Sequence, residues 1–287
     1  MYKQFIITIA ATLLLCLTGC GKGNEAEKRL AEAKTMYENQ QFIAAKSAID
    51  SIHTLFPREI KIRKEALTLM RLVERGESEQ NIAFCDSLIP IRRNELENLK
   101  KGFVFEKDST YDEMGNYIWK TMTIERNVER SYIRCGVNEE GEMYMASVYF
   151  GSHPIEHTGL KFSTKDGTFA ETPAIPYDGG VNYRFKDLGN TTEVVTYKGE
   201  NCKAIANFIS IIDEKERIKV EYTGGKNFSF TLPDADKKAI KATYELALVL
   251  SDITAMQKEK SKSEKKILLI DNKLNKDSNN SNELKQE

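Results

Sequence analysis

The chain has 287 residues, of which 42 are Lys or Arg and 43 are Asp or Glu, so its formal net charge is −1. This balance excludes a protein that binds nucleic acid through bulk positive charge. Hydrophobic residues make up 40% of the chain and aromatic residues 9%, which is enough for one large core or two modest cores and excludes wholesale disorder.

The first twenty residues have the organisation of a secretory signal. Lys3 precedes a continuous apolar stretch over residues 5–16, which is shorter than the ~20 residues that a transmembrane helix needs. The stretch ends in Leu17-Thr18-Gly19-Cys20. This tetrapeptide resembles the lipobox of bacterial lipoproteins, in which a large apolar residue and two small residues precede the cysteine.

The resemblance implies a signal peptide over residues 1–19, cleavage before Cys20, and attachment of diacylglycerol and a further acyl chain such as palmitate to that cysteine. Two or three acyl chains hold a protein on a membrane almost permanently. We therefore expect a lipid-anchored protein of the cell envelope, and Gly21 after the cysteine favours an outer-membrane protein that faces the periplasm. A plain secretory peptide with an incidental cysteine is the alternative.

Three cysteines remain in the mature chain besides Cys20. Cys135 and Cys202 are both expected on strands, whereas Cys85 is expected on a helix. An oxidising envelope permits one disulfide, for which Cys135 and Cys202 are the better pair. Three small buried thiols are the alternative.

Two short amphipathic helices are predicted near the start of the mature chain. Apolar stripes lie before and after Asn39-Gln40-Gln41, and Pro57 ends the second stripe. Five apolar residues of these stripes have a spacing that resembles one tetratricopeptide repeat: Ala33, Met36, Ala45, Ile49 and Ile52. The residues that follow do not repeat this pattern. An ordinary antiparallel helix pair is the alternative.

Three further helices are expected. The third helix covers about residues 58–75 and ends before Gly76. The last of the three is a C-terminal helix that begins after Pro233 and extends to residue 273. The fourth helix, slightly kinked at Pro90, has a coiled-coil seam of Ile82, Cys85, Ile89, Arg92, Leu96, Leu99 and Phe103. We predict that the fourth helix and the C-terminal helix pack together as a base for the central module. Separate docking of each helix on a sheet is the alternative.

The central segment has a different composition. Residues 102–232 hold 13 of the 17 glycines and 19 of the 26 aromatic residues, which indicates short strands joined by turns. The expected strands are 103–107, 117–124, 132–137, 143–150, 160–163, 168–171, 182–186, 193–197, 204–212, 218–223 and 228–232. This number and spacing predict an antiparallel β-sandwich or barrel-like module.

The expected fold class is therefore α+β, with N-terminal helical hairpins, a β module and a long C-terminal helix. The expected segments are a signal peptide (1–19), a helical region (20–101), the β module (102–232), the C-terminal helix (233–273) and a disordered tail (274–287).

Few residues suggest catalysis. His153, Glu156 and His157 spell the H-x-x-E-H string of some zinc peptidases, but that string needs a helix. Glycines and strands on both sides predict an ordinary polar loop, so these residues are only weak metal-ligand candidates. No G-x-S-x-G string, Cys-His arrangement or glycine-rich phosphate loop is present, and no cofactor is expected.

Loop aromatics are the remaining candidates for ligand binding. Tyr111, Tyr117, Trp119, Tyr177 and Tyr183 flank segments rich in Asp, Asn and Gly. Such side chains can stack on a sugar ring, although aromatics also fill most β-cores.

These features favour a non-enzymatic lipoprotein that binds a protein partner in the envelope or acts as a scaffold. The lipobox and the helical hairpin resemble those of uncharacterised lipoproteins of double-membrane bacteria. A module that binds a glycan or a peptidoglycan fragment is the alternative, and a hydrolase is a remote one.

Overall fold

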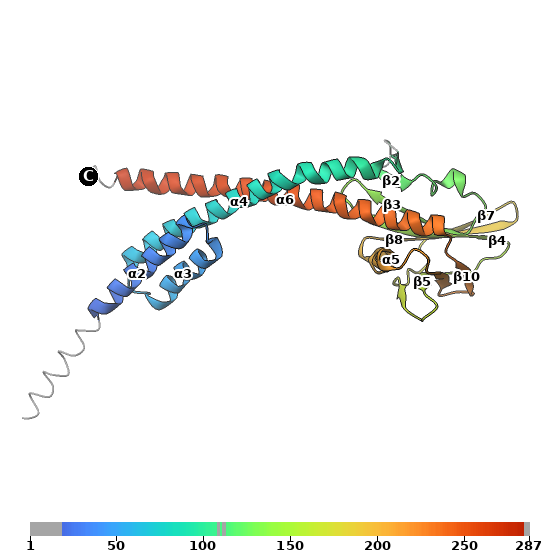
Figure 1. Cartoon of the computed structure of the whole chain (residues 1–287), viewed down its shortest axis with the longest axis horizontal. Coiled ribbons are helices and arrows are strands. Elements are labelled where there is room, and N and C mark those ends of the chain that lie inside the picture. The colour runs from blue at the N-terminus through green and yellow to red at the C-terminus, as the bar shows by residue number, and fades with distance from the viewer. Residues whose placement is uncertain (1–18, 108–109, 111–112, 284–287) are drawn as a thin grey trace, which may run out of the picture. The chain divides into compact units, whose positions relative to one another are not determined.

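The computed structural model describes residues 19–107, 110 and 113–283, with side chains from residue 23 to residue 277. The fold is α+β, as predicted (Figure 1). The chain divides into two compact units, one formed by the described parts of Met1–Ser87 and Gln257–Glu287, the other by Leu88–Met256. The long helices α4 (Ile60–Lys100) and α6 (Asp234–Glu283) contribute to both units, whereas composition placed the segment borders at residues 101 and 232.

The first unit contains the expected helical hairpin. Helix α2 (Gly19–Glu38) and helix α3 (Phe42–Leu55) are joined by a tight turn in which Gln40 has a left-handed φ of 57°. Their apolar faces form a core with the first part of α4, made of Ala26, Leu30, Ala33, Phe42, Ala45, Ile49, Ile52, Phe56, Ile62, Ala66, Leu69 and Val73. The helix pair is confirmed, and its resemblance to a tetratricopeptide unit stays a prediction.

Gly76 does not end a helix. The third and fourth helices predicted from the sequence are one continuous helix, α4, which also passes through Pro90. A Cβ atom at residue 76 would lie 2.8 Å from the ring of Phe42. Because Gly76 has no side chain, the ring of Phe42 on α3 can lie against the backbone of α4.

Helix α6 is longer than predicted and includes residues 274–283 of the expected disordered tail, while residues 284–287 lie outside the described part of the chain. Several charged residues that follow Gln257 pair with α4 within the first unit. The pairs are Lys260 with Asp86 at 2.6 Å, Lys266 with Glu74 at 3.6 Å, Arg75 with Asp271 at 2.9 Å, and Arg71 with Asp277. Among the described residues, no helix is both long enough and apolar enough to cross a membrane.

The second unit contains two antiparallel sheets. The first has the order β1-β2-β3-β4-β8-β7, and the second has the order β10-β9-β5-β6. The strands are β1 (Phe103–Glu106), β2 (Asn116–Trp119), β3 (Tyr132–Asn138), β4 (Met143–Gly151), β5 (Gly159–Ser163), β6 (Phe169–Glu171), β7 (Asn182–Asp187), β8 (Asn190–Lys198), β9 (Lys219–Thr223) and β10 (Phe228–Thr231). Each sheet has two edge strands, so neither closes into a barrel.

One predicted strand is wrong. Residues 204–212 belong mostly to helix α5 (Glu200–Ile211), which buries Cys202, Ile205 and Ile209 on one side. This three-and-four spacing is helical, and the apolar run over residues 204–209, interrupted at Asn207, obscured it. A short 3₁₀ helix, η1 (Ile124–Arg126), likewise replaces the end of the predicted strand 117–124.

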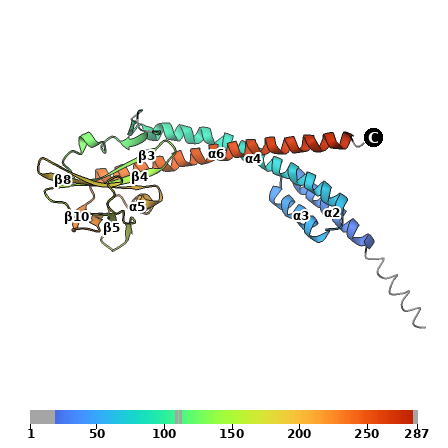
Figure 2. The ribbon, with the colours of Figure 1, turned by 180° about the vertical axis from the view of Figure 1, so that it is seen from behind.

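The predicted contact between the fourth helix and the C-terminal helix is confirmed within the second unit. Leu96 of α4 belongs to the same buried cluster as Ile240 and Leu250 of α6, and Arg92 pairs with Asp252 at 3.1 Å. The two helix segments lie side by side in Figures 1 and 2. The separate helical base was wrong, because the apolar face of α6 is part of the same core as both sheets and α5.

Candidate functional site

The face of the six-stranded sheet that points away from the main core carries a groove with a volume of about 410 Å³. We call it the aromatic groove. The residues that line it are Ile124, Asn127, Val128, Glu129, Arg130, Tyr132, Arg134, Tyr144, Ala146, Val148, Phe150, Tyr183, Phe185, Asp187, Leu188, Asn190, Thr192, Val194 and Thr196. All of them belong to the second unit.

Strand alternation produces the floor of the groove. In β8 every odd-numbered residue from Thr191 to Tyr197 is buried, and every even-numbered residue from Asn190 to Thr196 is partly exposed. The register pairs Val148 of β4 with Val194 of β8, and Tyr183 of β7 with the same Val194. Because side chains directly opposite each other share one face of a sheet, these residues form a continuous apolar row.

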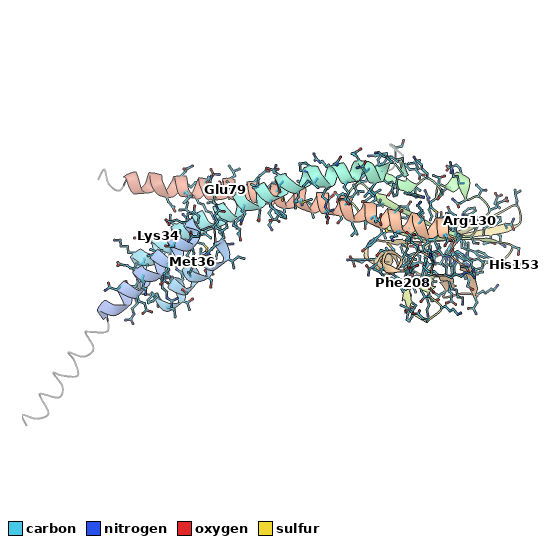
Figure 3. All side chains as sticks on the ribbon, in the orientation of Figure 1. Lys34, Met36, Glu79, Arg130, His153 and Phe208 are labelled. Carbon is cyan, nitrogen blue, oxygen red and sulfur yellow. The ribbon has the colours of Figure 1, made fainter. Side chains whose placement is uncertain are left out.

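One wall of the groove is the segment that joins β2 to β3. The buried Asn127 side chain donates hydrogen bonds to the carbonyls of Thr121 (2.9 Å) and Thr123 (2.8 Å) and accepts one from Arg130 (2.9 Å). Arg130 also pairs with Asp236 in the first turn of α6, and Figure 3 labels Arg130 beside this helix. These bonds hold the wall in place without a ligand.

Exposed apolar side chains lie on both sides of the groove. Val128 on the wall is 67% exposed, and Leu188 at the tip of the β7–β8 hairpin is 92% exposed. Two wall residues also have left-handed backbones, Glu129 with φ 58° and Leu188 with φ 46°. At Leu188 this conformation belongs to the two-residue turn between β7 and β8, in which Gly189 also has a positive φ of 86°.

The groove also contains an unsatisfied donor. Arg134 pairs with Glu106 through Nη2 at 2.9 Å. Its Nε is buried and has no hydrogen-bond partner among the described residues. Because this atom is buried, a group bound in the groove would reach it only after the surrounding side chains moved.

A second arrangement lies on the opposite face of the same strands. The Ser147 hydroxyl is 2.7 Å from His157 Nε2, and His157 Nδ1 is 2.9 Å from the Glu193 carboxylate. We call these three residues the buried relay. The ring of His157 stacks on Tyr222 of the second sheet with ring centroids 4.7 Å apart.

Glu193 organises the chain between β4 and β5. Its carboxylate accepts backbone N–H bonds from Ile155 (2.9 Å), Glu156 (2.9 Å) and His157 (3.3 Å), in addition to the His157 ring. Burial opposes the charged form, but these hydrogen bonds outweigh burial and hold the pKa of Glu193 below its usual value. A buried carboxylate with four donors is therefore satisfied as an anion.

The hydrogen bonds link Ser147, His157 and Glu193 in the same order as in a hydrolytic triad, but the position of Ser147 does not suit a nucleophile. Ser147 is fully buried in the middle of β4. A small cavity of about 90 Å³ touches His157 and Glu193, and Ser147 is not among its lining residues. The geometry supports a structural role, in which the buried relay fixes the loop between the two sheets.

The H-x-x-E-H residues lie in a loop, as predicted, between β4 and β5 (Figure 3 labels His153). The expected ordinary polar loop is wrong in one respect, because His157 is buried and bound to Glu193, whereas His153 and Glu156 are exposed. In the described part of the chain, no group of three or more His, Cys, Asp or Glu residues could hold a metal ion.

The proposed disulfide is not formed, since Cys135 and Cys202 are free and buried, as is Cys85. Cys135 lies on β3, where its Sγ is 3.4 Å from Thr243 Oγ1. Cys202 lies on α5 and donates to backbone carbonyls. Burial raises the pKa of Cys135 to about 12 and that of Cys202 to about 11, so both thiols stay protonated.

The five aromatic candidates do not meet in one site. Tyr183 lines the aromatic groove, Trp119 lines a different pocket, and Tyr177 lies in the small cavity beneath Arg184. Tyr117 packs on Phe105, and Tyr111 lies outside the described residues. The sequence argument missed Ser147 and Glu193, although a glutamate at an inward position between Thr191 and Val195 could have revealed a buried carboxylate.

No known protein-family model matches the chain, and no curated protein matches it.

Proposed function

We propose that the protein is a non-enzymatic lipoprotein of the cell envelope, anchored through Cys20 and facing the periplasm from the outer membrane. It acts there by binding an extended apolar segment of a partner protein in the aromatic groove. The observation that carries the proposal is this groove, a largely apolar sheet face of about 410 Å³ that the described chain leaves open.

The chemistry of the groove favours a protein segment. Its floor is a row of aliphatic and aromatic side chains, and its walls carry Val128 and Leu188 with most of their surface in water. Exposed patches of this kind mark interaction surfaces in soluble domains. A polypeptide would supply apolar side chains for the floor.

Cross-linking tests the location of the partner. A photoreactive benzoylphenylalanine at residue 185, in the full-length anchored protein, should give a discrete adduct with one protein in intact cells. Phe185 is 51% exposed on the groove face. The matched control is residue 169, because Phe169 is 53% exposed on the other sheet. Equal labelling from both positions, or no adduct from residue 185, would contradict the proposal.

A double substitution tests the energetic role of the groove. For this test the photoreactive residue is placed at position 128. Phe185→Ser with Leu188→Ser should then reduce recovery of the cross-linked partner at least tenfold, because two apolar contacts are removed from the interface. The folding stability should change by less than about 0.5 kcal/mol, since both side chains are exposed. Undiminished recovery would show that the partner binds elsewhere.

A second candidate function is binding of a glycan or a peptidoglycan fragment. The exposed rings of Tyr183 and Phe185 are nearly parallel, with an interplanar angle of 14° and centroids 6.4 Å apart. Such a pair can stack on sugar faces. Saturable binding of a purified muropeptide, lost in Tyr183→Ser, would favour this candidate over a protein partner.

The anchor is tested at Cys20. Replacing Cys20 with Ala should abolish incorporation of labelled palmitate and leave the protein uncleaved or released from membranes, because the acyl chains supply the attachment. Cys16→Ala is the matched control and should still be acylated. A Cys20→Ala protein that incorporates palmitate and fractionates with membranes would refute the lipobox assignment.

A further inference from the structure

A second pocket lies elsewhere in the second unit and is independent of the aromatic groove. It has a volume of about 810 Å³ and is bordered by the end of α4, the strands β1 and β2, the end of α5 and the start of α6. We call it the Trp119 pocket. Its lining combines an apolar floor with a wall of lysines.

Trp119 is one of the apolar residues that line the pocket. Its ring packs edge-on against Phe103, with centroids 5.1 Å apart and an interplanar angle of 84°. The ring also lies over Gly102, where a Cβ atom would come within 2.2 Å of it. The glycine and Phe103 therefore fix the ring in place. The other apolar lining residues are Leu99, Ile209, Ile212 and Ala242.

The lysine wall is built by α6 and by the loop after α5. Lys237 is buried, and its ammonium donates to the carbonyls of Glu214 (2.5 Å) and Glu216 (2.8 Å). These bonds fasten the loop to the helix and define the wall. Lys238 and Lys241 are one helical turn apart and line the same pocket.

The charges limit the ligand to one with little negative charge. Lys215, Lys237, Lys238 and Lys241 line the pocket together with three carboxylates, those of Glu214, Asp234 and Glu245. The carboxylates would repel a polyanion such as an oligonucleotide or a polyphosphate. A single anionic group beside Lys238 and Lys241 can avoid that repulsion while its apolar body covers the floor.

We propose that the Trp119 pocket binds a single-headed amphiphile of the chemical class of long-chain carboxylates. The apolar chain lies on Trp119 and Phe103, and the carboxylate meets the ammonium groups of Lys238 and Lys241. This site takes a small molecule and does not depend on the partner bound in the aromatic groove.

The chain provides its own reporter, because Trp119 is its single tryptophan. Titration of the mature protein with the fluorescent fatty acid cis-parinarate should give saturable energy transfer from Trp119. Lys238→Gln with Lys241→Gln should weaken binding about tenfold, as expected for the loss of two partly solvated charge contacts. Parinaric acid methyl ester should bind both proteins equally, and added salt should weaken binding of the acid alone.

Two further variants complete the test. Lys186→Gln with Lys198→Gln removes the same charge outside the pocket and should leave the affinity unchanged. Ala242→Phe fills the pocket and should abolish the energy transfer. The proposal fails if transfer does not saturate, if the two lysine pairs behave alike, if the acid and the ester bind equally well to the unmodified protein, or if Ala242→Phe still binds.

Discussion

Replacing Glu193 with Ala should destabilise the second unit by about 3–5 kcal/mol, the cost of removing one partner from a buried charged network. The substitution leaves the backbone N–H groups of Ile155, Glu156 and His157 and the His157 ring without their acceptor. Urea unfolding followed by Trp119 fluorescence measures this loss, because the single tryptophan lies in the second unit.

Glu156→Ala is the control for this substitution, since Glu156 has a 65% exposed side chain that pairs, among the described residues, with Arg184 at the surface. Its loss should be below about 1 kcal/mol. A similar loss from both variants would contradict the structural role of the buried relay.

The buried relay also predicts a pH dependence. The folded pKa of Glu193 is lowered, so its stabilisation is fully present above the unfolded glutamate pKa of about 4.3 and is lost as the pH falls through the folded pKa. The difference in stability between the unmodified protein and Glu193→Gln should therefore shrink below about pH 4. A constant difference down to pH 2 would show that this carboxylate does not titrate with folding.

Replacing Leu96 with Asp should destabilise the second unit by about 3 kcal/mol or more, because the loss of a buried leucine combines with burial of an unpaired charge. Leu96 is 7% exposed and shares its core with α6. We expect amide protection over residues 234–256 to fall together with that of residues 88–100. Hydrogen exchange resolved by peptide gives both measurements.

The matched substitution on the same helix is Ile91→Asp. Ile91 is 63% exposed and lies five residues before Leu96. Its effect should stay within about 0.5 kcal/mol. If Leu96→Asp lowers protection only in α4 and leaves residues 234–256 unchanged, the contact between the two helices contributes little to folding.

Local chemistry was sufficient to predict most of the fold. Turn residues such as Asn138 and Gly141, with apolar runs on either side, predicted the hairpins that the structure contains. Helix α6 began where Pro233 indicated, with Asp234 and Asp236 in its first turn. These features depend on residues close in the sequence, so one sequence was enough to find them.

Several errors and omissions arise from distant contacts. Gly76 was read as a helix end because its partner, the Phe42 ring, lies 34 residues earlier. The buried relay joins β4, the β4–β5 loop and β8, and the aromatic groove joins β3, β4, β7 and β8. Strand order decides which of these residues meet, and composition does not encode strand order. Of the aromatic candidates that the structure describes, only Tyr183 lines the groove.

The β9–β10 hairpin contacts the loop that Glu193 organises. A Cβ atom at Gly225 would lie 2.0 Å from the carbonyl oxygen of Ile155, and Lys226 donates its backbone N–H to that same oxygen at 2.7 Å. Glycine is therefore required at residue 225 while the loop keeps its present path, which the carboxylate of Glu193 helps to hold. The two positions should be epistatic: Gly225→Ala should be severe in the unmodified protein and much milder in a Glu193→Ala background, where the loop is free to move aside.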